Sequence, residues 1–253
     1  MKGVEAKEKV IIKDSKEIHI INIKDIDGEF SEVIDKYFVK ICEGDSGSKI
    51  KIVKKKVRKF LDSKSDETKI GAIAEFFIHL HLNKLNFKQE CKFLNLEEGS
   101  IKKGFDGYYS KNNEEWIMES KSGFITTKNI SHVSKIKVAY EDLDNKIKGD
   151  TSNDPWNNAY NHACHRDIGT KESIITHIKK LSDDFEEDKF YNIKDFNIIP
   201  GATIFLDGTW IDNNFDEQIN KVEKLISKLN YNKIIVICLT KKCMNLFIKF
   251  LEK

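Results

Sequence analysis

The chain has 253 residues, of which 40% are hydrophobic and 10% aromatic. This content excludes an intrinsically disordered protein and suffices for the core of one large domain or two small ones. With 43 Lys and Arg against 41 Asp and Glu, the formal net charge is only +2. Binding to a nucleic acid must therefore be argued from local patches rather than from the total charge.

The cysteines and the apolar runs indicate the cellular compartment in which the protein is expected. The five cysteines are odd in number and form no CxxC pair, which gives no disulfide framework and indicates a reducing environment. No apolar run is long enough to span a bilayer, and the N-terminus lacks the apolar region of a signal peptide. We expect a cytoplasmic protein.

Residues 1–48 are expected to form an N-terminal β-rich extension. Two β-favouring runs, 10–12 and 18–23, are followed by a helix over 31–41 and by a glycine- and serine-rich loop over 44–48. The remaining residues, 49–253, are expected to form one α/β domain.

A basic segment follows the loop. It contains no acid, and the hydrophobic residues Ile50, Ile52, Val53, Val57 and Phe60 between its charges indicate an ordered element. Charge runs are most often solvated faces, but next to a site for phosphodiester chemistry this one would contact a nucleic-acid backbone. Its basic residues are Lys49, Lys51, Lys54, Lys55, Lys56, Arg58 and Lys59.

Glu75 lies in an almost wholly apolar run from Ile70 to Leu85, which at this length favours a buried helix over a strand. An unpaired carboxylate on the apolar face of that helix would cost on the order of several kcal/mol. A metal ion or a lysine would remove this cost. His79 shares the face and is expected to be a core histidine with an ordinary hydrogen bond.

Three strands are predicted next. The first covers 87–94, and the other two, 104–109 and 116–121, are rich in aromatic and β-favouring residues. The polar stretch between the latter two contains Lys111-Asn112-Asn113, which is typical of a hairpin turn.

Glu119 and Lys121 are two residues apart in the second strand of this hairpin, so they project from the same face, with Ile117 behind them. Asp106 can reach that face from the neighbouring strand. Two carboxylates and an ammonium group at one point would suit a hard divalent cation and an activated water.

Asp106 followed by Glu119-Ser120-Lys121 resembles the catalytic motif of the PD-(D/E)xK nuclease superfamily. Phe105 stands where the family has the proline of its name. The resemblance implies a restriction-endonuclease-like α/β fold, in which helices flank a mixed central sheet. It also implies Mg²⁺-dependent hydrolysis of DNA, with Mn²⁺ as a substitute.

The same resemblance assigns roles to individual residues. Asp106, Glu119 and the carbonyl of Ser120 would hold the metal, and Lys121 would orient or help deprotonate the attacking water. An acidic residue on a preceding helix often completes such sites, and Glu75 is the candidate here.

The remaining residues predict alternating helices and strands. A helix over 131–147 is expected behind the sheet. A strand over 198–206, a helix over 216–229, a strand over 234–239 and a helix over 241–253 form a βαβα unit, which is expected to extend the same sheet.

His162, Cys164 and His165 offer side chains that zinc prefers, but no fourth ligand is evident in the sequence. The alternative is a helix whose histidines, with Arg166, contact phosphate groups of a nucleic acid.

More narrowly, the site motif and the layout of the chain are similar to the nuclease subunit of the Hachiman bacterial anti-phage defence system. This resemblance implies a helicase (ATPase) partner that restrains the nuclease until it meets abnormal DNA. Two alternatives stay open: a stand-alone restriction-type endonuclease, and a non-catalytic module of the same fold that binds nucleic acid or a partner.

Overall fold

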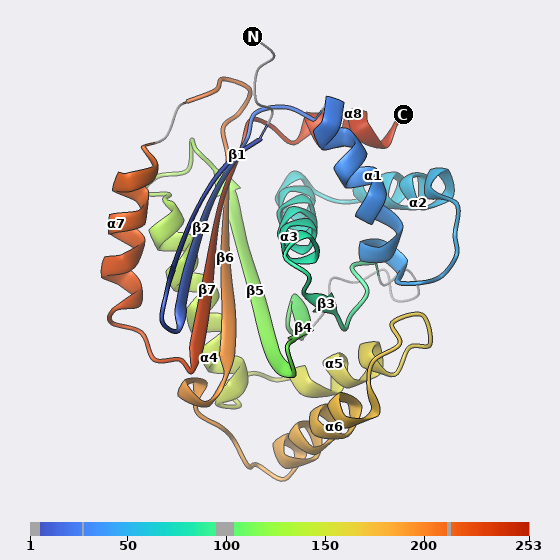
Figure 1. The fold of residues 1–253 in the computed structure, drawn as a ribbon, viewed down its shortest axis with the longest axis vertical. Helices are drawn as coiled ribbons and strands as arrows, with labels where there is room; N and C mark the ends of the chain where they lie inside the picture. Colours follow the sequence, from blue (N-terminus) through green and yellow to red (C-terminus); the bar gives the residue numbers. More distant parts are fainter. Residues whose placement is uncertain (1–5, 27, 95–103, 212–213, 253) are drawn as a thin grey trace.

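The computed structural model describes residues 6–26, 28–94, 104–211 and 214–252. They form an α/β fold around a seven-stranded mixed sheet with the strand order β1-β2-β7-β6-β5-β4-β3 (Figure 1). The strands are β1 (Ala6–Lys13), β2 (Lys16–Ile23), β3 (Lys88–Gln89), β4 (Gly107–Lys111), β5 (Glu114–Phe124), β6 (Asn197–Phe205) and β7 (Lys233–Lys241). The helices are α1 (Gly28–Glu43), α2 (Ile50–Asp62), α3 (Asp66–Lys84), α4 (His132–Ile147), α5 (Pro155–Ala163), α6 (Glu172–Glu186), α7 (Phe215–Ile226) and α8 (Asn245–Leu251).

The two β-favouring runs near the N-terminus pair as an antiparallel hairpin, β1–β2. Strand β2 then continues the sheet as a parallel neighbour of β7. The described part of the first 48 residues therefore shares its sheet with the rest of the chain, and α1 contributes to the same hydrophobic core.

The C-terminal third confirms the predicted βαβα unit, because β6, α7, β7 and α8 follow one another and β6 pairs with β7 in parallel. The unit extends the common sheet, as expected. Strand β7 runs on to Lys241, and the last helix is correspondingly shorter than the predicted 241–253.

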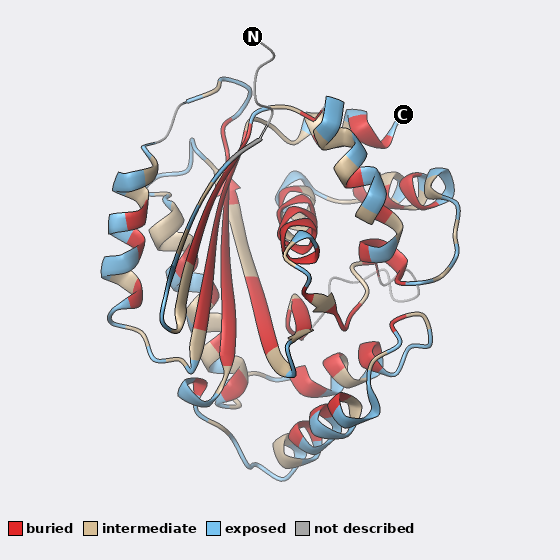
Figure 2. Ribbon diagram, in the orientation of Figure 1, coloured by how far each residue is buried: buried red, intermediate tan, exposed pale blue. Residues whose placement is uncertain are grey.

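Alternation along the strands produces two cores, one on each face of the sheet. In β7, Ile235, Ile237 and Leu239 face the helices α1, α2, α3 and α8, whereas Ile234 and Val236 face α4 to α7. Burial on both faces explains why the run is continuously apolar. Figure 2 shows the central strands buried along most of their length, with the outer sides of the helices exposed.

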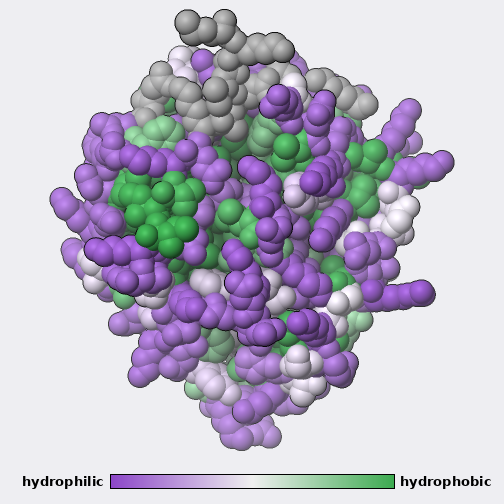
Figure 3. Space-filling view, viewed as in Figure 1, coloured by the Kyte–Doolittle hydropathy of each residue, from purple (hydrophilic) through white to green (hydrophobic). Residues whose placement is uncertain are grey.

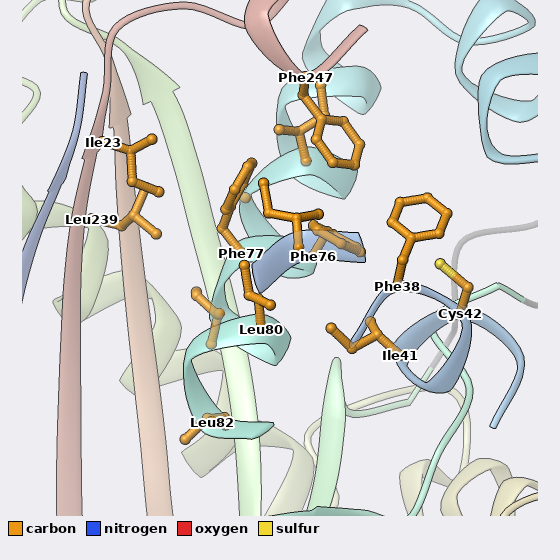
Figure 4. Close-up of a cluster of buried hydrophobic side chains, with 14 of the residues drawn as sticks. Ile23, Phe38, Ile41, Cys42, Phe76, Phe77, Leu80, Leu82, Leu239 and Phe247 are labelled. Atoms are coloured by element: carbon orange, nitrogen blue, oxygen red, sulfur yellow. The ribbon is translucent and has the colours of Figure 1, made fainter. Parts of the chain in front are cut away.

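Helix α3 is the centre of the first core. Figure 4 shows Phe77 and Leu80 on the side of α3 that faces Ile23 and Leu239 of the sheet. On another side of the helix, the ring of Phe76 lies 5.3 Å from the ring of Phe38 in α1. Because α3 is covered on several sides, its sequence is apolar almost all round.

The strand predicted over 87–94 is wrong for most of its length, since only Lys88 and Gln89 pair with β4. The chain leaves the ladder at Glu90, a buried carboxylate that accepts hydrogen bonds from side-chain hydroxyl groups. The backbone N–H groups of Phe93 and Leu94 then donate to carbonyl groups at the end of α1 instead of to a strand.

The surface is mostly polar. Figure 3 shows that hydrophilic side chains cover most of this face of the molecule. Among the described residues, none of the helices has the length and apolar character needed to cross a membrane.

Candidate active site

The predicted hairpin is confirmed, because β4 and β5 pair in antiparallel fashion on either side of Asn112 and Asn113. Both asparagines have a positive φ, 51° and 63°, a conformation that asparagine tolerates better than most residues and that two-residue hairpin turns require. The register places Gly107 opposite Met118. Asp106, one residue earlier, therefore lies next to the segment that begins at Glu119.

Beyond Met118, β5 extends past the end of β4, and among the described residues only β6 pairs with it there. At this edge Asp106 Oδ2 accepts a hydrogen bond from the backbone N–H of Ser120 at 2.8 Å. The N–H and C=O of one strand residue point to the same edge, so the Ser120 carbonyl also faces the Asp106 side. The Ser120 hydroxyl is buried and has no hydrogen-bond partner among the described residues.

Glu119 and Lys121 project from the face that Ile117 shares, as predicted, and helix α4 covers this face. Glu119 is 3% exposed, and each of its carboxylate oxygens contacts an ammonium group. Lys121 Nζ lies 3.0 Å from Oε1, and Lys146 Nζ lies 2.5 Å from Oε2. Lys121 also pairs with Asp142.

Asp142 and Lys146 are site residues that sequence reasoning missed. They are four residues apart on α4 and therefore lie on one side of that helix. The signal that could have found them is this acid–base pair on the helix directly after the Glu-x-Lys strand. Their contacts with the site depend on how α4 packs against β5, and this packing cannot be predicted from the sequence pattern.

One cavity of about 440 Å³ joins these residues to α3. Asp106, Glu119, Ser120, Lys121 and Lys146 line one side of it, and Glu75 lines another.

The Glu75 carboxylate lies 3.1 Å from His79 Nε2, and the other nitrogen of that buried ring pairs with the hydroxyl of Tyr109. His79 is thus the hydrogen-bonded core histidine that was expected. The structure therefore brings all four predicted catalytic residues to one cavity.

The electrostatics of the cavity disfavour further negative charge. Burial raises the pKa of Asp106 to about 6, assisted by the charge of Glu75. Burial likewise raises the pKa of Glu119 to about 7, assisted by Asp106, and these effects outweigh the two neighbouring ammonium groups. Burial alone would lower the pKa of Lys121, but Glu119 and Asp142 raise it above its usual range. Lys121 is therefore an ammonium cation at neutral pH.

The fit of a metal can be judged from the same groups. Four carboxylates and two ammonium groups belong to the cavity or to its ion pairs, if the exposed Glu67 is left out. The carboxylates are Glu75, Asp106, Glu119 and Asp142, and the ammonium groups are Lys121 and Lys146. When all six are ionised, their formal charges add up to −2. One divalent cation would neutralise this charge. Carboxylate and carbonyl oxygens are the ligands that Mg²⁺ prefers, so the residues fit that ion.

The carboxylates do not yet form a three-ligand group. Among the described residues, the one set of three His, Cys, Asp or Glu side chains whose ligand atoms all lie within 4.8 Å of each other is Glu8, His19 and His81. At least one pair among the Glu75, Asp106 and Glu119 carboxylates is therefore more than 4.8 Å apart, and Lys146 occupies a cation's position at Glu119.

The basic segment forms helix α2, and part of its predicted role is wrong. Lys54 is 7% exposed, pairs with Asp35 at 2.8 Å and lies 4.0 Å from the ring centroid of Phe250. It is therefore unable to reach a phosphate. Lys56 pairs with Glu43, and Arg58 pairs with acids as well.

The rest of that segment stays exposed. Lys51, Lys55 and Lys59 recur every four residues, so they lie along one side of α2. Lys49 precedes the helix and is exposed too. Among the predicted hydrophobic anchors, Ile52 is 51% exposed and anchors nothing, whereas Val53 and Val57 are buried.

The ligand atoms of His162, Cys164 and His165 do not form a close group with one another among the described residues. His162 Nδ1 accepts a hydrogen bond from the backbone N–H of Lys92 at 3.2 Å, and His165 contacts the side chain of the same lysine at 2.8 Å. The Cys164 side chain is exposed. These histidines hold the segment around Lys92 against the end of α5.

Neither a model of a known protein family nor a curated protein matches the chain.

Proposed function

We propose that the chain is a metal-dependent nuclease of the PD-(D/E)xK type, with a restriction-endonuclease-like fold, that hydrolyses phosphodiester bonds in DNA. The observation that carries the proposal is the hydrogen bond from Ser120 N–H to Asp106 beside the buried Glu119 carboxylate. It fixes the Asp106 carboxylate beside the Ser120 carbonyl and next to Glu119, at a cavity large enough for a phosphate and water.

In this proposal Asp106, Glu119 and the carbonyl of Ser120 would hold Mg²⁺, with Glu75 on the opposite wall. When bound, the metal would lower the pKa of a coordinated water and offset charge on the scissile phosphate. Lys121, kept cationic by Glu119 and Asp142, orients the attacking water and stabilises negative charge on the phosphate rather than accepting a proton. Lys146 neutralises Glu119 until the metal arrives.

The test compares cleavage of linear duplex, single-stranded and plasmid DNA by the wild type and by Asp106→Asn and Glu119→Gln, in Mg²⁺, Mn²⁺ and EDTA. Each substitution should lower the rate roughly 100-fold or more while far-UV circular dichroism stays unchanged. The matched control is Glu114→Gln, a partly exposed carboxylate at the start of the same strand that pairs with Lys233. Full activity of either site variant in Mg²⁺ would contradict the proposal.

The Hachiman resemblance extends the proposal to a regulated subunit that works with a helicase partner in anti-phage defence. Purification from the native host, with co-eluting proteins identified, tests this part. A lone monomer or homodimer that cuts one defined sequence would favour the restriction-type alternative instead.

The contact between Lys146 and Glu119 favours a second candidate, a module that binds DNA without cutting it. In that case the ammonium group would be a permanent replacement for the metal. Retained DNA binding with no cleavage in Mg²⁺ or Mn²⁺, and no effect of either ion on thermal stability, would support this candidate.

A further inference from the structure

Three side chains with metal-ligating atoms meet on the α3 side of the sheet, away from the candidate active site. They are Glu8 of β1, His19 of β2 and His81 in the last turn of α3. Both histidines are buried, and the Glu8 side chain is 32% exposed. The contact joins residues 62 positions apart in the chain.

The fold explains why these residues meet. Side chains alternate along β2, so His19 points to the same face as Ile21 and Ile23, which belong to the core around α3. The hairpin register pairs Glu8 with Ile21, and paired strand residues point to the same face.

The separations of the three ligand atoms suit one small cation. His81 Nε2 lies 3.0 Å from His19 Nδ1 and 3.6 Å from Glu8 Oε1, and His19 Nδ1 lies 3.7 Å from Glu8 Oε1. The circle through the corners of this triangle has a radius of about 2.0 Å, which matches zinc–nitrogen bonds of about 2.0–2.1 Å. An ion at or slightly above its centre would reach all three atoms without rearrangement of the backbone.

A second carboxylate orients one of the ligands. Glu17 Oε2 lies 3.1 Å from His19 Nε2, the ring nitrogen that faces away from the triangle. When Nε2–H donates to Glu17, Nδ1 keeps the lone pair that a metal needs. Metal-binding histidines almost always have such a partner on the second nitrogen, which also raises their basicity.

We propose that Glu8, His19 and His81 bind one Zn²⁺, which fastens the β1–β2 hairpin to the last turn of α3. Two imidazoles and one carboxylate are a ligand set that zinc uses, and they disfavour Mg²⁺ and Ca²⁺. A cavity of about 80 Å³ adjoins Glu8 and His81 and has room for a water as the fourth ligand, although its lining is otherwise apolar apart from Lys84. The site is independent of the proposed nuclease chemistry.

The alternative for the same atoms is a hydrogen-bonded chain in which a proton lies between His19 and His81. The two cases differ in metal content, so the experiment measures Zn²⁺ binding directly. The protein is stripped with a chelator, titrated with Zn²⁺ in the presence of excess Mg²⁺, and assayed for bound zinc. Co²⁺ is then substituted to record the visible absorption of a four-coordinate site. All variants carry Asp106→Asn and Glu119→Gln, so that a failure of the nuclease proposal leaves this result intact.

One Zn²⁺ per chain is expected in this background, with an increase in Tm that excess Mg²⁺ does not reproduce. His81→Gln should remove the bound zinc and the Co²⁺ absorption. Glu17→Gln should weaken Zn²⁺ binding roughly 10- to 100-fold while leaving one site per chain, because Glu17 acts only through His19. The matched control is His177→Gln, an exposed histidine paired with Glu115, which should change nothing.

Glu8→Gln keeps the proposal testable if the histidine variants fail to fold, because Glu8 lies at the sheet edge and is partly exposed. It should weaken binding and abolish the Zn²⁺-dependent increase in Tm. Absence of stoichiometric zinc in the parent background would overturn the proposal in favour of the proton-sharing chain. Equal zinc affinity in the parent, Glu8→Gln and Glu17→Gln proteins would overturn it as well.

Discussion

Lys146 Nζ lies 2.5 Å from Glu119 Oε2 and also donates to the carbonyl of Gly104 at 2.9 Å. One ammonium group from α4 thus connects β5, which carries Glu119, to Gly104, which lies two residues before Asp106. Because Glu119 is buried, its charge has to be compensated whether or not a metal is bound.

Replacing Lys146 by glutamine should therefore make the protein depend on the metal. Without Mg²⁺ it leaves Glu119 with only Lys121, and removing one partner of a buried pair typically costs about 3–5 kcal/mol. Mg²⁺ should restore much of that loss, so the increase in Tm on adding Mg²⁺ should be larger in the variant than in the wild type. Lys148→Gln, an exposed position on the same helix that pairs with Asp144, is the control. An identical Mg²⁺ response in all three proteins would contradict a metal site at Glu119.

Lys121→Ala should abolish most cleavage without unfolding the protein. Its ammonium group is partly exposed in the cavity, and electrostatic stabilisation of this kind contributes roughly 100-fold or more to the rate. Asp142→Asn offers the matched comparison, because it removes the lysine's second partner but leaves the ammonium group in place. Single-turnover cleavage at saturating Mg²⁺ should fall far more in the first variant than in the second. Equal losses would mean that the Lys121–Asp142 pair is structural.

The features that were predictable from the sequence are those that depend on a short stretch of chain. The Asp106 and Glu119-Ser120-Lys121 arrangement was predictable because it depends on strand alternation and on one short turn at Asn112 and Asn113. The βαβα unit was predictable for a similar reason, since each of its elements has a clear periodicity in the sequence.

Features set by distant contacts were not predictable. Lys54 was assigned to a phosphate-binding stripe, but α1 places Asp35 beside it and α8 places Phe250 beneath it. Asp142 and Lys146 belong to the site because α4 packs against β5 so that they contact Lys121 and Glu119. Glu8, His19 and His81 have no common motif in the sequence, because three separate elements bring them together.

The exposed lysines of α2 should bind the DNA backbone without reading bases. A variant with Lys51, Lys55 and Lys59 changed to glutamine should bind DNA more weakly. The affinity should fall by about the same factor for unrelated sequences, because phosphate contacts carry no sequence information. The slope of log K against log salt should decrease by roughly one unit per lost contact. The control triple, Lys221, Lys224 and Lys228 to glutamine, removes three exposed lysines around α7 on the opposite face of the sheet. An unchanged affinity and slope in the α2 variant would make this side of the helix a solvated surface or a protein interface.

Lys241, at the end of β7, is a buried lysine that has no role in the proposed chemistry. Its side chain is 0% exposed, and its Nζ has no hydrogen-bond partner among the described residues. The Nζ lies 4.1 Å from the ring centroid of Phe77, a cation–π contact that offsets only part of the cost of burying the charge. Burial lowers the pKa of Lys241 to about 7, despite the nearby charge of Asp25.

The Lys241 contribution to the stability of the wild type should therefore increase with pH above pH 7, whereas the raised pKa values of Asp106 and Glu119 make the stability decrease as the pH rises towards 7. The pKa of Lys241 is about 7 when folded and 10.5 when unfolded, so between these values the unfolded state binds the additional proton. The penalty is absent above pH 10.5, grows as the pH decreases, and reaches on the order of 4 kcal/mol at pH 7. Lys241→Met keeps the length of the side chain and removes the charge, so it should stabilise the protein at pH 7 and flatten this dependence. Urea unfolding between pH 7 and about pH 10 measures both effects, with the neighbouring and less buried Lys242→Met as the control. The same pH dependence in the wild type and in Lys241→Met over this range would show that Lys241 is charged and solvated.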